Sequence, residues 1–137
     1  MKVKQLDHIN LTVANLEATI DWYGRVFGFE VVERDVKNGV NWAVIRSGEA
    51  MLCIYEHSAS QFHDRFELAK RGTHAVSHFA LRIEDADEWI ETMRREGITP
   101  SYGGVIEWPH SKAWYVNDPT GYEIEIACWQ NDEVAFG

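Results

Sequence analysis

One pattern occurs twice in the sequence, and this repeat constrains the fold more than any other feature. The segments Leu6–Val13 and Val76–Ile83 both alternate apolar and polar residues, and both carry a histidine at the third position. Apolar residues at helical spacing follow each segment. A chain with two such copies is expected to fold as two similar halves.

Each repeated strand divides its residues between two faces. Alternate apolar residues, from Ile9 to Val13 in the first copy and from Phe79 to Ile83 in the second, share one face. Because successive side chains of a strand point to opposite sides, His8 and His78 lie on the other face. We expect the apolar faces to pack against helices and the two histidine-bearing faces to meet around one cavity.

Each half is expected to continue with a helix and three more strands. The first helix is predicted to follow Asn15 and stop at Gly28; the second follows Asp85, with Glu88 resembling a capping box, and stops at Gly97. The later strands are predicted at Glu30–Arg34, Trp42–Arg46, Met51–Tyr55, Thr99–Tyr102, Ala113–Asn117 and Tyr122–Ala127. The fold class is therefore α+β, with two paired βαβββ modules.

The length sets the domain organisation. A chain of 137 residues, 45% of them hydrophobic, makes one ordinary domain with its own core. We expect a single domain over residues 1–137. Its first module covers about residues 4–57, a linker with a short helix covers 58–73, and the second module covers about 74–130.

The charge and the apolar runs exclude several partners. The net charge is −9, whereas nucleic acids and anionic membranes select a basic face. The apolar run Ala50–Tyr55 is too short to span a bilayer, and Met1–Asp7 has no signal-peptide pattern. We expect a cytoplasmic protein with no nucleic-acid or membrane partner, in which Cys53 and Cys128 are free thiols.

A third candidate ligand accompanies the two histidines. Ile124 and Ile126 belong on the core face of the last strand, which places Glu125 on the opposite face. A carboxylate between apolar strand residues is unusual, because burying an unpaired charge is costly. His8, His78 and Glu125 would form a three-ligand divalent-metal site suited to Fe(II), Mn(II) or Zn(II), and less often to Ni(II) or Co(II).

These motifs resemble the vicinal oxygen chelate superfamily, which includes glyoxalase I, type I extradiol dioxygenases, fosfomycin-resistance thiol transferases and bleomycin-binding proteins. The resemblance rests on the two histidine segments and on the run Tyr115–Glu125, with its Asp-Pro-Thr-Gly turn. It implies paired βαβββ modules that form a half-open β-barrel around a metal site, with Fe(II) or Mn(II) ahead of the other ions. It also implies a small-molecule substrate with vicinal oxygens.

Departures from the family patterns reduce the number of reactions that fit this chain. Glyoxalase I is similar but uses a fourth, carboxylate ligand late in the first half, where this chain has Leu52 or Cys53; Glu56 would need a register shift. Fosfomycin-modifying enzymes also carry basic residues for the phosphonate. No Lys or Arg follows Glu125, although Lys112 and Arg82 remain available.

The remaining pattern is the facial triad of non-haem Fe(II) oxygenases, so extradiol cleavage is the favoured reaction. Resemblance to that family assigns Tyr115 to hold the reacting oxygen and His63 to act as acid and base. A glyoxalase-type isomerase and a fosfomycin-type thiol transferase remain alternatives. A further alternative is a metal-free drug-binding protein whose walls are Trp42, Trp108, Trp114 and Trp129.

An oligomeric state is also expected. Half-open barrels leave sheet edges that a second subunit commonly covers, and cyclic dimers are the prevailing closed assembly. The apolar segment Ala127–Trp129 and the tryptophan-rich second half motivate this expectation. The predicted assembly is a homodimer.

Overall fold

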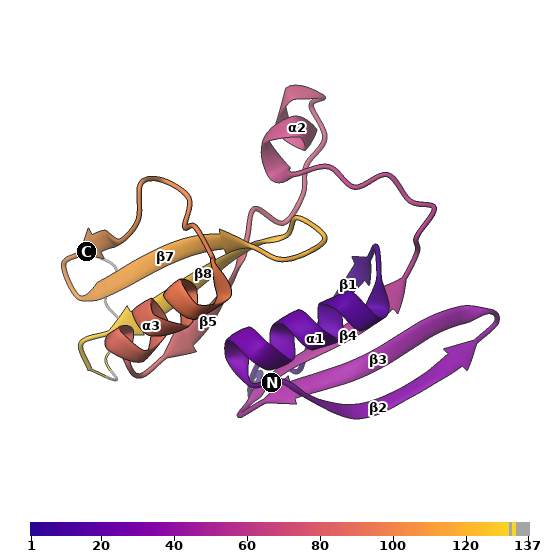
Figure 1. Ribbon diagram of the computed structural model, residues 1–137, viewed down its shortest axis with the longest axis horizontal. Coiled ribbons are helices and arrows are strands. Elements are labelled where there is room, and N and C mark those ends of the chain that lie inside the picture. The colour runs from indigo at the N-terminus through magenta and orange to yellow at the C-terminus, as the bar shows by residue number, and fades with distance from the viewer. Residues whose placement is uncertain (132, 134–137) are drawn as a thin grey trace. The chain divides into compact units, whose positions relative to one another are not determined.

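The chain forms two compact units with the same order of elements. The computed structural model describes residues 1–131 and 133. The chain consists of a first compact unit, residues 1–62, and a second compact unit, residues 63–137. In each unit a four-stranded sheet carries one long helix against one face (Figure 1). The predicted α+β fold class is confirmed.

The first unit is a complete βαβββ module. Strand β1 and strand β4 are parallel neighbours, and β3 and β2 follow in antiparallel order, giving β1-β4-β3-β2. The elements are β1 (Ile9–Val13), α1 (Leu16–Phe27), β2 (Glu30–Lys37), β3 (Val40–Ser47) and β4 (Ala50–Glu56).

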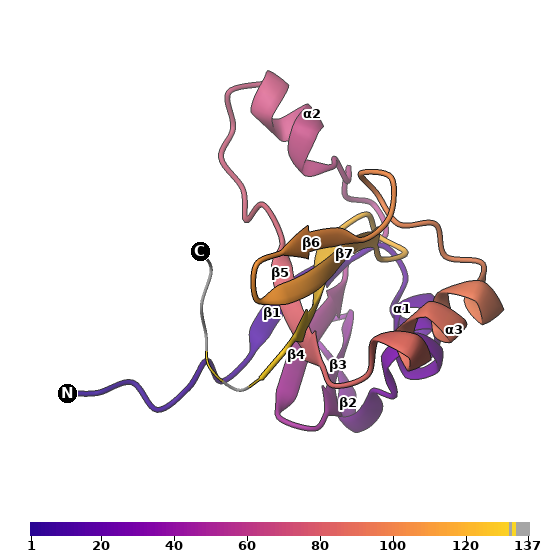
Figure 2. The same cartoon turned by 90° about the vertical axis from the view of Figure 1, so that its left-hand side faces the viewer.

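The second unit repeats this topology after a short helix. Its sheet has the order β5-β8-β7-β6, again with the first pair parallel and the others antiparallel. Figure 2 shows β6 and β7 side by side as a hairpin. The elements are α2 (Arg65–Lys70), β5 (Phe79–Ile83), α3 (Ala86–Glu96), β6 (Ile106–Trp108), β7 (Ser111–Asn117) and β8 (Glu123–Trp129).

Both long helices begin and end where the sequence predicts. The Asn15 side chain accepts a hydrogen bond from the Ala18 backbone N–H, and Asp85 accepts from the backbone N–H of Asp87 and of Glu88. Gly28 ends α1 with φ +66°, and Gly97 ends α3 with φ +65°. Glycine adopts this left-handed conformation without steric cost, so both helices stop cleanly.

One apolar face of each sheet forms the core of its unit. Tyr23 of α1 is fully buried, as are Ile45 and Ile54 of the first sheet. In the second unit Trp89 of α3 and Ile126 of β8 are buried. The predicted parity of the repeated strands is confirmed, because Leu11, Val13 and Phe79 are buried whereas the intervening Asn10, Ala80 and Arg82 are exposed.

One predicted strand is wrong. Residues Thr99–Tyr102 form no strand, and the strand that pairs with β7 is Ile106–Trp108 instead. The physical reason is a run of left-handed backbone, with φ of +57° at Tyr102, +82° at Gly103 and +119° at Gly104. A strand requires extended, negative-φ residues, so the chain turns at this point.

The segment 58–73 contains one short helix, α2, which opens with a capping box between Asp64 and Glu67. Cys53 and Cys128 are free cysteines. Among the residues that the structure describes, no helix is long and apolar enough to cross a membrane.

Candidate metal centre

The second unit brings two of the predicted ligands together. Ala80 of β5 is the partner of Glu125 on the neighbouring strand β8, and His78 lies two residues before Ala80. The Nε2 atom of His78 is 3.0 Å from Oε2 of Glu125. The Glu125 side chain is only 17% exposed. An imidazole nitrogen just before β5 and a half-buried carboxylate on the adjacent strand β8 therefore face one another.

The turn before β8 sets the register of Glu125. Oδ1 of Asp118 accepts hydrogen bonds from the backbone N–H groups of Thr120, Gly121 and Tyr122, at 2.8–2.9 Å. Gly121 has φ +104°, which a side chain would strain. The Asp-Pro-Thr-Gly motif thus fixes the tight turn from which β8 starts, and with it the face on which Glu125 lies.

Tyr115 completes this part of the site. It lies directly opposite Glu125 in the β7–β8 pair, and its ring is 5.4 Å from the His78 ring in an edge-on arrangement. Burial, and then the negative charge of Glu125, raise the pKa of Tyr115 to about 12. The phenol is therefore neutral at physiological pH and can donate a hydrogen bond.

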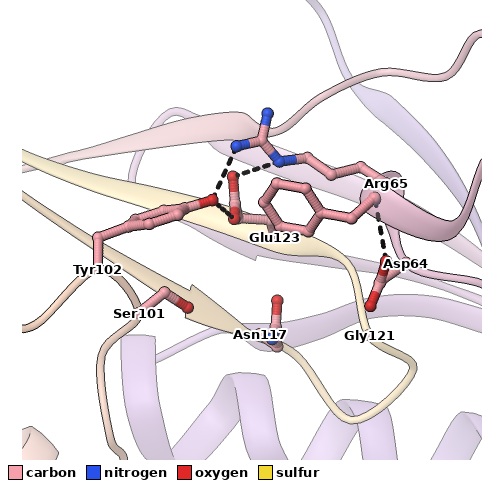
Figure 3. A pocket seen from close by; sticks show the side chains of 8 residues that line it. Asp64, Arg65, Ser101, Tyr102, Asn117, Gly121 and Glu123 are labelled. Atoms are coloured by element: carbon pink, nitrogen blue, oxygen red, sulfur yellow. Dashed lines mark hydrogen bonds and ion pairs between the residues drawn. The ribbon is translucent and has the colours of Figure 1, made fainter. Parts of the chain in front are cut away.

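A second carboxylate, Glu123, is buried behind His78. Its side chain is 6% exposed, and its Oε2 accepts a hydrogen bond of 2.6 Å from the Tyr102 hydroxyl. Nε of Arg65 lies 3.1 Å from its Oε1, and Arg65 also donates to the Tyr102 hydroxyl at 2.7 Å. Figure 3 shows Arg65 and Tyr102 converging on Glu123 at the edge of a pocket.

His63 lies at the start of α2 and contacts that helix. Its Nε2 is 3.0 Å from a guanidinium nitrogen of Arg71, and its Nδ1 is 3.6 Å from the Glu67 carboxylate. A guanidinium has only donors, so Nε2 of His63 accepts in this contact and has no proton. His63 would have to leave Arg71 before that nitrogen could take a substrate proton.

His8 belongs to the first unit, immediately before β1. Its Nδ1 is 2.7 Å from Oδ1 of Asp7, and its side chain is 42% exposed. A carboxylate on Nδ1 leaves Nε2 as the nitrogen available to a metal ion. Joint coordination by His8, His78 and Glu125 stays a prediction.

Leu52, Cys53 and Glu56 lie near the position where glyoxalase I has its fourth, carboxylate ligand, and Glu56 is the one carboxylate among these three residues. Leu52 is buried in the core, and burial, followed by the charge of Asp7, raises the pKa of the Cys53 thiol. Glu56 caps α1 instead, since its carboxylate accepts hydrogen bonds from the Leu16 backbone N–H at 2.7 Å and from the Asn41 side chain at 3.1 Å. These hydrogen bonds lower the pKa of Glu56.

The His78–Glu125 pair supplies two of the three ligands of the predicted metal site. A neutral imidazole and a carboxylate are ordinary ligands for first-row divalent ions. Within either unit taken by itself, no group of three or more His, Cys, Asp or Glu side chains among the described residues could hold a metal ion.

The sequence did not reveal the group around Glu123. Glu123 shares the face of Glu125 by strand parity, and this was the one available signal. The sequence predicts a strand at Tyr102, although its positive φ places it in a turn. Arg65 lies in the predicted linker, and nothing in its sequence context connects it to β8.

Comparison with known proteins gives one family. Residues 5–126 match the Glyoxalase/Bleomycin resistance protein/Dioxygenase superfamily. The chain is 31% identical to MhqA of Bacillus subtilis, which is named as a ring-cleaving dioxygenase, over 89% of this chain and 39% of that protein. It is 30% identical to a lactoylglutathione lyase of Neisseria meningitidis over 89% and 88%. It is 26% identical to a catechol-2,3-dioxygenase of B. subtilis over 93% and 44%.

Solved structures show the same fold. A glyoxylase/bleomycin resistance protein/dioxygenase domain from Frankia superposes with a TM-score of 0.79 at 16% identity, covering 96% of both chains. The fosfomycin resistance protein FosX from Listeria monocytogenes, solved with Mn(II) and sulfate, gives 0.70 at 18% identity, covering 96% of this chain and 98% of that one. The chain spans less than half the length of the two dioxygenase relatives.

Proposed function

The chain belongs to the glyoxalase/bleomycin resistance protein/dioxygenase superfamily, and from this premise we propose that it is a divalent-metal-dependent enzyme acting on a small substrate with vicinal oxygens. The observation that carries the proposal is the 3.0 Å distance between His78 Nε2, just before β5, and Glu125 Oε2 on the adjacent strand β8. His8 is the proposed third ligand. Fe(II) or Mn(II) is preferred to Zn(II), Ni(II) or Co(II).

When bound, the ion supplies Lewis-acid polarisation and holds two neighbouring substrate oxygens side by side. The protein residues supply the rest. Tyr115, neutral because its pKa is raised to about 12, donates a hydrogen bond to a substrate oxygen beside Glu125. His63 is the proposed acid and base, and it becomes available once its contact with Arg71 opens.

Extradiol ring cleavage is the favoured reaction. His8, His78 and Glu125 would hold the ion and leave it accessible to substrate and dioxygen, and a fourth, carboxylate ligand would reduce that access. The capping role of Glu56 and the burial of Leu52 support a three-ligand site. MhqA and catechol-2,3-dioxygenase are relatives named for this class of reaction.

A glyoxalase-type reaction is the second candidate. The lactoylglutathione lyase of N. meningitidis matches over 88% of its own length, whereas the dioxygenase relatives are more than twice as long as their matched segments. A fosfomycin-type transfer is less favoured. Of its possible anion-binding residues, Arg82 donates to the backbone of Asn131 and Lys112 lies 3.8 Å from Glu107.

Metal-free drug binding is less favoured because Trp108, Trp114 and Trp129 of the second unit do not share one face of their sheet. Trp114 is buried in the core of the second unit, Trp108 is exposed, and Trp129 lies under Arg82. Trp42, in the first unit, stacks on Tyr55. By strand pairing, Trp114 lies on the opposite face of the second sheet from Trp108 and Trp129, so these three tryptophans do not form one wall.

The test compares two reactions on one preparation. Protein loaded anaerobically with Fe(II) is expected to consume oxygen when a catechol is added, and protein loaded with Ni(II) is expected not to isomerise the glutathione–methylglyoxal adduct. Oxygen uptake should fall strongly in Tyr115→Phe and in His63→Ala. Isomerase turnover without oxygen uptake would establish the glyoxalase-type alternative. Unchanged ring cleavage in His63→Ala would remove His63 from the mechanism.

A further inference from the structure

A pocket of about 70 Å³ lies in the second unit beside the buried carboxylate of Glu123 (Figure 3). It lies where the start of α2 meets the turn after α3 and the turn between β7 and β8, and its lining includes Arg65, Phe66, Tyr102 and Asn117. The volume is several times what one water molecule requires and well below that of a whole substrate site. The pocket therefore suits one small chemical group.

Among the described residues, two buried atoms at this pocket have no hydrogen-bond partner. One is a donor, Nε of Arg65, and the other is an acceptor, Oε1 of Glu123. They are 3.1 Å apart and form an ion pair without a hydrogen bond, and the Glu123 side chain is only 6% exposed. Buried polar atoms normally have partners, so an unmatched donor beside an unmatched acceptor indicates a place for a group that matches both.

We propose that this pocket binds an uncharged substituent of the substrate that both donates and accepts hydrogen bonds, such as a hydroxymethyl group or a primary carboxamide. The substituent donates to Oε1 of Glu123 and accepts from Nε of Arg65. This inference rests on the proposed function and deepens it, because it adds a second, neutral polar end to a substrate with vicinal oxygens.

The charges at the pocket favour a neutral group. The Arg65 guanidinium and the Glu123 carboxylate compensate each other, and the Tyr102 hydroxyl donates to the carboxylate at 2.6 Å and accepts from Arg65 at 2.7 Å. A charged ligand would lose its hydration without gaining a free counter-charge, which is costly. Asp64 also lines the pocket, but it is exposed, and its Oδ1 accepts hydrogen bonds of 2.9 Å from two backbone N–H groups of α2.

The position of the pocket connects it to the proposed metal site. Glu123 and Glu125 lie two residues apart on the same face of β8, a distance of about 7 Å along the strand. The Tyr102 ring contacts the Tyr115 ring edge-on at 5.3 Å, and Tyr115 lies opposite Glu125. A substrate whose vicinal oxygens lie at Glu125 would therefore place its other end in the pocket, with Phe66 as the apolar part of the lining.

The first experiment measures the charge selectivity of the pocket in metal-free protein. The probes are benzamide, benzoate and benzylammonium, which share a ring and differ in the charge of the attached group. Binding is followed by NMR through the backbone signals of Tyr102 and Gly121, two residues of the lining. Because no metal ion is present, the result does not depend on the metal site.

Wild-type protein is expected to bind benzamide roughly tenfold more tightly than either charged probe, the ratio that one hydrogen bond to a charged group provides. Glu123→Gln leaves Arg65 uncompensated, so benzoate should become the preferred probe. Arg65→Met leaves Glu123 uncompensated, so benzylammonium should become the preferred probe. The controls Glu91→Gln and Arg94→Met change an exposed ion pair on α3 and should keep the wild-type order.

The second experiment tests whether the pocket receives part of the substrate. Calorimetry on Zn(II)-loaded protein compares catechol with 3,4-dihydroxybenzyl alcohol, which carries an additional hydroxymethyl group. This group is expected to strengthen binding roughly tenfold in the wild type and in the Glu91→Gln control, and to strengthen it less in Glu123→Gln. Equal affinities of the wild type for the two compounds would overturn the link between the pocket and the substrate.

Three results in metal-free protein would overturn the pocket itself: no probe shifts the two signals, the wild type prefers a charged probe, or both variants keep the wild-type order. If Glu123→Gln does not fold, Arg65→Met decides, since the Arg65 side chain is 31% exposed on a short helix. Wild-type protein that binds no Zn(II), Mn(II) or Fe(II) would instead contradict the proposed function. The probe measurements would stand in that case, so the two failures are distinguishable.

Discussion

The Tyr102 hydroxyl provides a quantitative test of the buried group around Glu123. Tyr102→Phe removes the hydroxyl and keeps the ring that contacts Tyr115 edge-on at 5.3 Å. The variant deprives a carboxylate that is 6% exposed of its 2.6 Å hydrogen bond. A hydrogen bond to a buried charge contributes about 1.5–3 kcal/mol to the free energy of unfolding.

The exposure of Tyr102 reduces this value. The residue is 49% exposed, so water can reach part of the vacated position, and we expect a loss at the lower end, about 1–2 kcal/mol. For a chain of this length that loss corresponds to a fall in Tm of roughly 4–8 °C. Urea unfolding, followed by circular dichroism, measures the free energy directly.

The matched control is Tyr55→Phe in the first unit, where the ring stacks on Trp42 at a centroid distance of 6.3 Å. That variant is expected to stay within about 0.5 kcal/mol of the wild type. A Tyr102→Phe protein as stable as the control would mean that Glu123 is not held by this hydroxyl.

Three further outcomes are expected. Glu56→Gln should lower the stability of the protein without lowering its metal content. Because the pKa of Glu56 is lowered in the fold, the stability difference from wild type should be present at neutral pH, above the ordinary glutamate pKa of 4.5. This difference should disappear as the pH falls through the lowered pKa. Ile126→Ala, at a fully buried position of β8, should cost about 2–5 kcal/mol in urea unfolding, whereas a cost under about 1 kcal/mol would contradict the core assignment. Sedimentation should show a homodimer, and a 15.8 kDa species alone at micromolar concentration would refute that expectation.

The sequence predicted the regular part of the fold well because the relevant signals are local. Asn15 and Gly28 bound α1, and the alternation along β8 assigns Ile124 to the core and Glu125 to the other face. Strand parity and capping depend on a few neighbouring residues, so a single sequence contains them.

The parts that the sequence missed depend on long-range contacts or on unusual backbone. Tyr102 has positive φ without being glycine, which sequence patterns rarely reveal. Arg65 reaches Glu123 across 58 positions of the chain, and no periodicity connects a linker residue to a strand at that distance. The role of Glu56 was also missed, because its partners Leu16 and Asn41 lie on other elements.

The metal content of the purified protein tests the central claim most directly. Elemental analysis of protein prepared without added metal is expected to find one divalent ion per chain. His8→Ala, His78→Ala and Glu125→Ala should each lose most of it while circular dichroism still reports a folded protein. Retention of a full equivalent of metal in the His78→Ala protein would contradict the assignment.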